Sequence, residues 1–238
     1  MGGTGEGVDG VSSGVNALWW NLTYRRRMLA QVHLLRPWYH PMLLPGLILT
    51  RPITQETVGQ WWNAERGRRK WDQFILPLIR DHILGATVLE LGTNSSLNLV
   101  LALQHGARLA MGVEPDRRYY AQALLVRQCL GLMGTLSITR CLSDFEQTIP
   151  AAYGQVDLGL MCAVLRHIPE AERVTTLERM GRLCRRIFIQ GSGLADAPDG
   201  DSVESVMCSV REAGLRVEEM RCIRHVRGFS VRVTSNTR

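Results

Sequence analysis

The sequence predicts an α/β protein whose β-sheet is mostly parallel. The first observation behind this is a regular alternation of apolar, strand-like runs with helix-like stretches. The expected strands cover residues 86–91, 108–113, 135–140, 156–162 and 185–190, and the expected helices cover residues 96–105, 117–131 and 170–183. Because parallel strands need long crossover connections, usually helices, this order predicts a parallel sheet with right-handed crossovers.

The second observation concerns the end of the chain. A helix expected over residues 202–213 is followed by strands over 215–223 and 226–233, with only a short connection at Arg224-His225. Two strands joined so closely pair antiparallel. The sheet is therefore expected to end in a hairpin.

The third observation is a break in composition before the first strand. All six tryptophans precede residue 72: Trp19, Trp20, Trp38, Trp61, Trp62 and Trp71. We expect a disordered leader over residues 1–15, a Trp-rich helical lid and substrate module over 16–82, and the α/β domain over 83–238. Helices are expected over 16–35 and 62–81, the second bent or restarted at Pro77.

Composition excludes several classes of protein. Apolar residues make up 45% of the chain, but no uninterrupted run of about 18 apolar residues occurs, so no membrane-spanning helix is expected. The Gly- and Ser-rich start lacks the apolar core of a signal peptide. The six cysteines form no CxxC pair and have no zinc-ligand spacing. We expect reduced thiols, no metal and a cytoplasmic protein.

Positive charge is concentrated near the N-terminus. Residues 1–80 hold ten basic and five acidic residues, a net charge of +5, and the remainder holds 18 and 17, a net charge of +1. An anionic partner would therefore meet the N-terminal third, which carries the cluster Arg25-Arg26-Arg27.

A glycine turn follows the first expected strand. Glu90 ends the apolar run, and Gly92 and Asn94 follow it. A glycine lets a ligand approach the backbone because it has no Cβ, and Glu90 can orient the loop or accept a hydrogen bond from a ligand ammonium group. A strand-to-helix turn that binds nothing is the alternative.

A second acid, Glu114, follows the next strand. Two strand ends with carboxylates about twenty residues apart suit a nucleotide-binding sheet, in which the second acid accepts from the ribose hydroxyls. Alternatively, Asp116 caps the following helix and Glu114 has no particular role.

Two further strand ends supply candidates. After the third strand, Asp144 or Glu146 can accept from an adenine amino group, with Phe145 or Leu142 as a stacking face. Cys162 ends the fourth strand, at the edge where ligands bind in open parallel sheets. His167, beyond it, is a candidate general base or a loop-holding residue.

These residues together resemble class I S-adenosylmethionine-dependent methyltransferases. The segment Lys70-Trp71-Asp72, followed by an apolar stretch and Pro77, is similar to the tRNA wobble-uridine methyl/carboxymethyl transferases and their small-molecule-acting relatives, as is the region from Trp38 to Thr50. The chain departs from them at Ser96, where the family has Gly, and at Arg166, where it has Tyr.

The resemblance implies a Rossmann-like methyltransferase sheet that binds S-adenosyl-L-methionine. The implied cofactor-binding residues are Lys70, Glu90, Gly92, Asn94, Glu114, Asp144, Phe145 and Cys162. A carboxylated cofactor remains an option because of Lys70. Tyr39, His40 and His167 are the candidate catalytic residues on the acceptor side.

We expect methylation of an O or N atom of a small molecule, in specialised metabolism. The alternatives are a tRNA-modifying enzyme, in which the basic N-terminal third contacts phosphates, and a non-catalytic protein that binds S-adenosylmethionine. The sequence leaves the acceptor and the oligomeric state open.

Overall fold

A seven-stranded sheet forms the centre of the molecule. The computed structural model describes residues 10–38, 40–50, 66–191, 202–223 and 228–235. The strands are β3 (Thr87–Leu91), β4 (Leu109–Val113), β5 (Leu136–Thr139), β6 (Val156–Cys162), β7 (Cys184–Gly191), β8 (Leu215–Ile223) and β9 (Gly228–Ser235), in the order β5-β4-β3-β6-β7-β9-β8. The strands from β5 to β7 pair parallel, and β9 runs antiparallel to both β7 and β8. The expected parallel sheet with a C-terminal hairpin is therefore confirmed.

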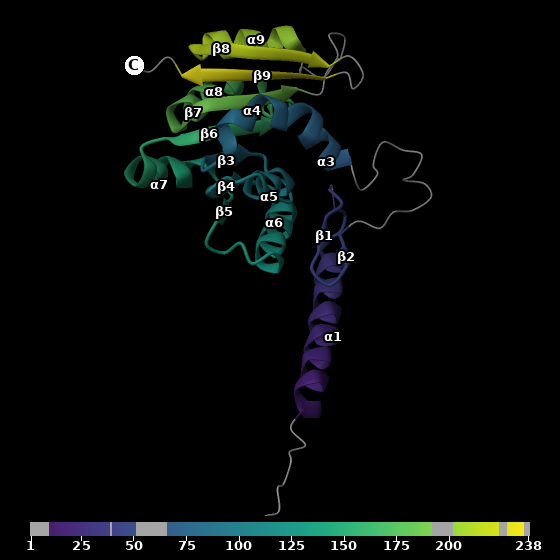
Figure 1. The fold of residues 1–238 in the computed structure, drawn as a ribbon. Coiled ribbons are helices and arrows are strands. Elements are labelled where there is room, and N and C mark those ends of the chain that lie inside the picture. Colours follow the sequence, from purple (N-terminus) through teal and green to yellow (C-terminus); the bar gives the residue numbers. More distant parts are fainter. Residues whose placement is uncertain (1–9, 39, 51–65, 192–201, 224–227, 236–238) are drawn as a thin grey trace, which may run out of the picture.

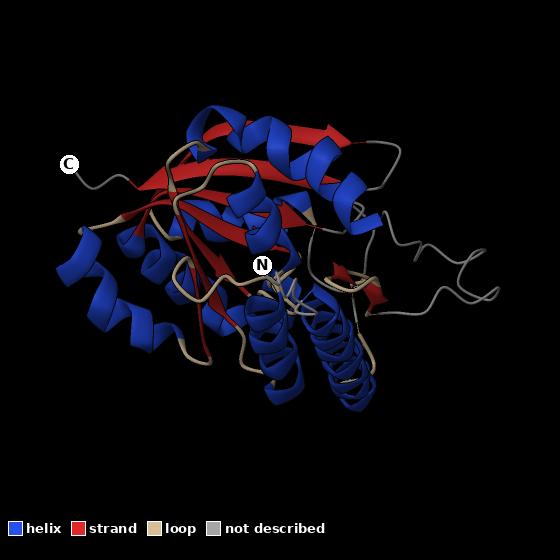
Figure 2. Ribbon diagram, turned by 60° about the horizontal axis from the view of Figure 1, so that its bottom comes forward, coloured by secondary structure: helices blue, strands red, loops and turns tan. Residues whose placement is uncertain are grey.

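Helices cover both faces of this sheet (Figure 2). On one face, α4 (Leu76–Ile83), α5 (Leu97–Gln104) and α6 (Arg117–Cys129) share a buried apolar core with the strands. On the other face, α7 (Leu142–Tyr153), α8 (Glu170–Leu183) and α9 (Val203–Glu212) share a second core. Strands buried on both sides explain why β3 has all five residues buried and reads as a continuous apolar run.

Strand register brings three connecting segments to one edge. In the central strand β3, Leu91 lies opposite Val113 of β4 and Met161 of β6. The residues that follow these positions therefore emerge side by side at the carboxyl edge of the sheet, which is where ligands bind in such folds.

The first helix packs outside this sandwich. α1 (Gly10–Leu34) is followed by the short antiparallel strands β1 (Leu43–Leu44) and β2 (Ile48–Leu49). Met28, Val32 and Trp38 pack against residues of α5 and α6 in a third core, and the buried Gln122 side chain donates hydrogen bonds to the Leu35 and Pro37 carbonyl oxygens. The rest of α1 extends away from the sheet (Figure 1).

The first helix is longer at its N-terminal end than expected. α1 begins at Gly10 rather than near residue 16, so residues 10–15 are helical. Apolar residues at 11, 15 and 18 continue the helical spacing of the segment that follows, which explains the longer helix.

The described parts of the 16–82 region lie in two places. α1, β1 and β2 pack on α5 and α6, whereas α3 (Arg66–Lys70), a π-helical segment (Trp71–Ile75) and α4 lead into the sheet. Trp71 and Ile75 are fully buried in the same core as the sheet. Pro77 lies at the start of α4, so the helix restarts there as expected.

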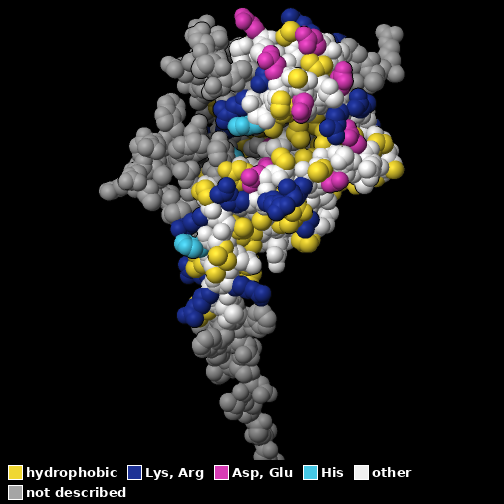
Figure 3. All heavy atoms as spheres, turned by 180° about the vertical axis from the view of Figure 1, so that it is seen from behind, with side chains coloured by type: hydrophobic (Ala, Val, Ile, Leu, Met, Phe, Trp, Pro, Cys, Tyr) yellow, Lys and Arg dark blue, Asp and Glu magenta, His cyan; other side chains and the backbone are white. Residues whose placement is uncertain are grey.

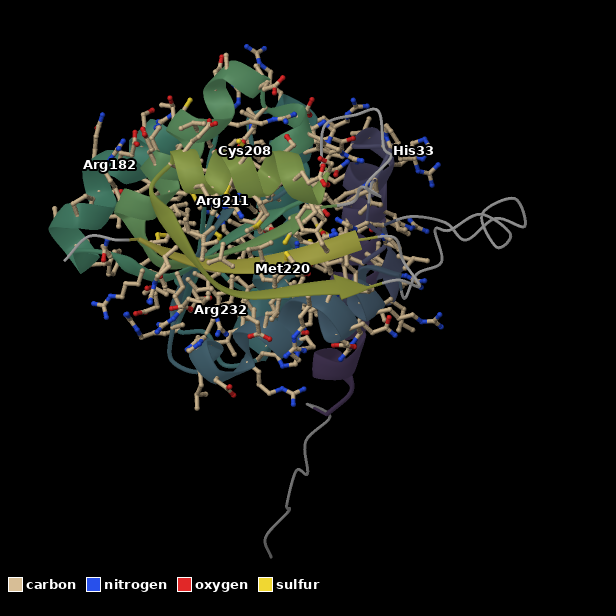
Figure 4. The ribbon with its side chains drawn as sticks, turned by 90° about the horizontal axis from the view of Figure 1, so that it is seen from above. His33, Arg182, Cys208, Arg211, Met220 and Arg232 are labelled. Atoms are coloured by element: carbon tan, nitrogen blue, oxygen red, sulfur yellow. The ribbon has the colours of Figure 1, made fainter. Side chains whose placement is uncertain are left out.

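The C-terminal hairpin is tied to α4. Arg232 on β9 donates to the Leu78 carbonyl oxygen (2.9 Å) and to Glu218 of β8 (3.0 Å). Figure 4 looks down on this end, with Cys208 and Arg211 on α9 and with Met220 and Arg232 on the strands. The C-terminal hairpin is therefore linked directly to α4, the helix that leads into the sheet.

One helix was not expected from the sequence. α7 covers Leu142–Tyr153, a stretch for which no helix was expected. Its apolar residues Leu142, Phe145 and Ile149 are buried at helical spacing. Pro150 lies inside this helix and obscures the pattern.

In the part of the chain that the structure describes, no helix combines the length and apolar character needed to cross a bilayer.

Candidate functional site

The turn after β3 needs glycine at its first position. Gly92 has a φ of +72°, and a Cβ there would lie 2.6 Å from Val164 Cγ2. The backbone N–H groups of Gly92 and Thr93 both donate to the Val113 carbonyl oxygen, at 2.9 and 3.1 Å. The turn is thus fixed to β4 on one side and lies against the segment after β6 on the other.

Left-handed backbone conformations gather around this turn. Asn94 (φ +51°), Ser96 (φ +67°) and Ala163 (φ +56°) are three of the four non-glycine residues with positive φ in the described chain. Each costs roughly 1–2 kcal/mol relative to an ordinary conformation. Ser96 has this left-handed conformation at the position where the family that the sequence resembles has Gly. The serine therefore introduces backbone strain that a glycine would avoid.

Glu114 locks the turn from the next strand. Its carboxylate accepts from the Asn94 N–H (2.7 Å) and from the Asp116 N–H (3.0 Å). The side chain is 6% exposed, and burial raises the pKa of Glu114. Asp116 caps α6 by accepting from the Arg118 and Tyr119 N–H groups, so capping and turn-holding are separate tasks. Each Glu114 oxygen keeps a lone pair for a further donor.

Glu90 is held by two side chains that the sequence interpretation overlooked. Thr93 Oγ1 donates to one carboxylate oxygen (2.8 Å) and Asn98 Nδ2 donates to the other (2.7 Å). Glu90 is 1% exposed. Burial raises its pKa to about 7, although Lys70 acts in the opposite direction. Asn98, a polar residue within an apolar helical stretch, was the available signal.

Lys70 and Cys162 adjoin this acid. Cys162 ends β6, and burial, together with the charge of Glu90, raises the pKa of its thiol to about 12. Lys70 acts electrostatically on both Glu90 and Cys162. The structure therefore brings Lys70, Glu90 and Cys162 together, and Cys162 is a neutral thiol there.

Asp144 and Glu114 both form hydrogen bonds with Thr139, which lies between them. Thr139 Oγ1 donates to Asp144 Oδ2 (2.6 Å), and the Thr139 carbonyl oxygen accepts from the Glu114 N–H (2.9 Å). Glu146 instead forms a two-bond ion pair with Arg179 of α8, both at 2.7 Å. Of the two competing acids, Asp144 is the one placed near the turn.

Phe145 differs from its expected position. Its ring is 7% exposed and packs in the core beneath α7 and α8, as does Leu142. Both residues lie on the buried face of α7, a helix that was not expected from the sequence. The open stacking face expected of them is therefore absent.

The candidate catalytic residues have different surroundings. His167 is exposed, and its Nε2 accepts from Arg166 Nε at 3.2 Å, so this ring nitrogen is already occupied. His40 lies beside α3, with Nδ1 3.6 Å from where a Cβ on Gly67 would be. Tyr39 lies outside the described residues.

Two hydroxyl groups in the turn have no partner. Ser95 Oγ and Ser96 Oγ are buried and make no hydrogen bond. Such groups each cost about 1–3 kcal/mol unless something binds them.

In the described residues, no group of three or more His, Cys, Asp or Glu side chains could hold a metal ion.

Comparison with known proteins gives matches in structure but not in sequence. No protein-family model matches the chain, and no curated protein matches it. The N-terminal domain of EvdMO1 with SAH bound has a TM-score of 0.56 at 20% identity, covering 90% of this chain and 97% of that chain. Magnesium protoporphyrin IX methyltransferase (ChlM) from Synechocystis PCC 6803 with bound SAH has a TM-score of 0.55 at 14% identity, covering 71% and 84%.

A third similar structure is the mitomycin 7-O-methyltransferase MmcR, with a TM-score of 0.52 at 19% identity, covering 63% of this chain and 49% of that chain. At these identities, the likeness concerns the fold. Together with the strand order and the helices on both faces, it shows that the chain has the Rossmann-like fold of class I methyltransferases.

Proposed function

We propose that this protein is an S-adenosylmethionine-dependent methyltransferase that modifies an O or N atom of a small molecule in specialised metabolism. The observation that carries the proposal is the Gly92 turn, held by Glu114 at the carboxyl edge of the sheet. A buried carboxylate with spare lone pairs beside a glycine turn suits a nucleoside.

The residues at this edge fit the cofactor. Glu114 would accept from the ribose hydroxyls, and Asp144 from the adenine amino group. The unpaired hydroxyls of Ser95 and Ser96 are donors that such a ligand would satisfy. Lys70, Glu90 and Cys162 border the space where the amino-acid end would lie. When bound, the cofactor supplies an electrophilic methyl group for a single displacement.

The chain's own contribution to the reaction is positioning and exclusion of water. The turn, braced by Val113 and Val164, holds one reactant in a fixed place. His40, Tyr39 and His167 are the candidates for removing a proton from the acceptor. His40 and His167 are the two of these candidates that the structure describes, and His167 Nε2 accepts from Arg166.

The nature of the acceptor is supported by the names of the similar proteins. ChlM is named for a porphyrin and MmcR for mitomycin, and both names indicate small-molecule acceptors.

Methyl-labelled S-adenosylmethionine would test the proposal. We expect wild-type protein incubated with a cell extract to transfer label to the small-molecule fraction, and Glu114→Ala to transfer much less. Label found in neither small molecules nor RNA, together with no binding of S-adenosylmethionine or S-adenosylhomocysteine, would contradict the enzyme. Binding without transfer would favour the non-catalytic alternative.

A tRNA-modifying enzyme is the second candidate. Arg25, Arg26 and Arg27 are exposed on α1, and the described part of this helix has no acidic residue. Figure 3 shows Lys and Arg side chains on this lower part of the molecule, whereas most Asp and Glu side chains lie above it. Label in the RNA fraction, with salt-dependent tRNA binding lost on neutralising the three arginines, would support this candidate.

A further inference from the structure

The environment of Glu90 suits two protonation states. The side chain is almost completely buried, so each carboxyl oxygen depends on a protein partner. Asn98 Nδ2 can only donate, and therefore fixes Oε1 as an acceptor at 2.7 Å. Thr93 Oγ1, 2.8 Å from Oε2, can donate to a carboxylate or accept from a protonated carboxyl group by rotating its hydroxyl hydrogen.

The Thr93 side chain is held so that only this hydrogen needs to move. Its methyl group packs over Gly112, where an added Cβ would lie 2.8 Å from Thr93 Cγ2. This contact directs the hydroxyl toward Glu90. A proton can thus enter or leave Oε2 without a change in heavy-atom positions.

Charged groups around Glu90 act on its pKa in both directions. Lys70 of α3 favours the carboxylate, whereas Glu114 at the end of β4 opposes it. Cys162 at the end of β6 is a neutral thiol, and α5 contributes only the uncharged Asn98. A new positive charge beside Glu90 would add to the effect of Lys70 and favour the carboxylate.

We propose that Glu90 is protonated before the ligand binds and releases its proton to solvent when the ligand's ammonium group arrives, with Thr93 and Asn98 as positioning residues. The proposal rests on the proposed function, because it takes the amino-acid end of S-adenosylmethionine or S-adenosylhomocysteine as the cation. It assigns Thr93 and Asn98 a role in setting ligand affinity as a function of pH.

Calorimetric titration with S-adenosylhomocysteine tests this in two buffers of different ionisation enthalpy. The difference between wild type and Glu90→Gln isolates the proton of Glu90 from protons exchanged by the ligand. With the pKa of Glu90 at about 7, the difference should be about 0.9 proton released at pH 6 and about 0.1 at pH 8. Wild-type affinity should rise about fivefold from pH 6 to pH 7 and almost twofold more from pH 7 to pH 8, and then level off.

Thr93→Val tests the positioning role. A hydrogen bond to a carboxylate is stronger than one to a neutral carboxyl group, so losing the hydroxyl should move the midpoint of the affinity profile to higher pH. Thr234→Val on β9, which removes a hydroxyl without a partner, should leave the midpoint unchanged. An equal effect of both variants on the midpoint would assign Thr93 a structural role only.

The outcomes separate the two proposals. Binding with no proton difference between wild type and Glu90→Gln would overturn the inference and leave the proposed function standing. No binding at any pH would overturn both.

Discussion

The pKa values of buried or partly buried acids shift in opposite directions at the two edges of the sheet. At the amino edge, Asp157 on β6 accepts from the Thr87 N–H (2.9 Å) and hydroxyl (2.8 Å). Burial opposes its ionisation, but these bonds and Arg185 lower the pKa of Asp157 overall. At the carboxyl edge, burial dominates and raises the pKa of Glu90.

Backbone conformations and hydroxyl groups follow the same division. The left-handed Asn94, Ser96 and Ala163 all lie at the carboxyl edge, as do the unpaired hydroxyls of Ser95 and Ser96. The amino edge closes with satisfied pairs between β3 and β6. The comparison indicates that one edge stabilises the fold, while the other stores strain and desolvation that a ligand can relieve.

The largest contrast is expected from two glycines with the same conformation. Gly92 (φ +72°) has Val164 Cγ2 2.6 Å from an added Cβ, whereas Gly85 (φ +71°), just before β3, has nothing within 4 Å. Gly92→Ala should lower the free energy of unfolding by about 2–5 kcal/mol through strain and overpacking.

Gly85→Ala is the matched control, because it shares the strain but has open space. Its cost should be only about 1–2 kcal/mol. Chemical denaturation of both variants measures the difference, and equal losses would show that space around Gly92 is not the constraint.

A pH-dependent stability difference is expected for Glu90→Gln. Because the folded pKa of Glu90 is raised from 4.5 to about 7, its protonated form stabilises the fold below the unfolded pKa, and this contribution is lost as pH rises to 7. By linkage, the variant should gain up to about 3 kcal/mol relative to wild type between pH 4.5 and 7. Urea titrations across this range measure it; a constant difference would mean that Glu90 has an ordinary pKa.

The opposite sign is expected at the amino edge. The lowered pKa of Asp157 gives stability that is present above its unfolded pKa and is lost as pH falls through the lower folded value. Asp157→Asn should cost about 1–2 kcal/mol at pH 7, from weaker hydrogen bonds with Thr87. Ligand affinity should not change. Weaker binding in this variant would contradict the view that only the carboxyl edge takes part in ligand binding.

The smallest effect concerns Ser96. Replacing it with glycine removes the cost of its left-handed conformation (φ +67°), so Ser96→Gly should raise the free energy of unfolding by about 1 kcal/mol. Thermal denaturation would show a higher midpoint. A lower midpoint would indicate that the buried hydroxyl has a partner in solution.

Sequence predicted the sheet well because both period and order are local signals. Every strand from 86 to 190 was expected within two residues, and so was the C-terminal hairpin. The helix α7 was not predicted, because Pro150 lies within it and proline is unusual inside a helix. Without that helix, Phe145 was expected to offer a stacking face, whereas its ring is in the core.

Only some residues of the candidate site could be predicted from the sequence. Glu90, Gly92 and Glu114 stand out because they end strands, and the structure places them at one edge. Thr93 and Asn98 become important only through contacts with Glu90, which depend on the turn's three-dimensional path. The tie between Arg166 and His167 is likewise a matter of rotamers that no sequence pattern encodes.

The most direct test is calorimetric binding of S-adenosylhomocysteine to wild type and Glu114→Ala, with Asp157→Asn as the control from the opposite edge. We predict measurable binding by wild type and by Asp157→Asn. For Glu114→Ala, we predict a loss of about 1–3 kcal/mol, roughly five- to 150-fold in affinity, because a charged hydrogen-bond acceptor is removed. No binding by wild type, or equal affinity in all three proteins, would contradict a nucleoside site at the carboxyl edge.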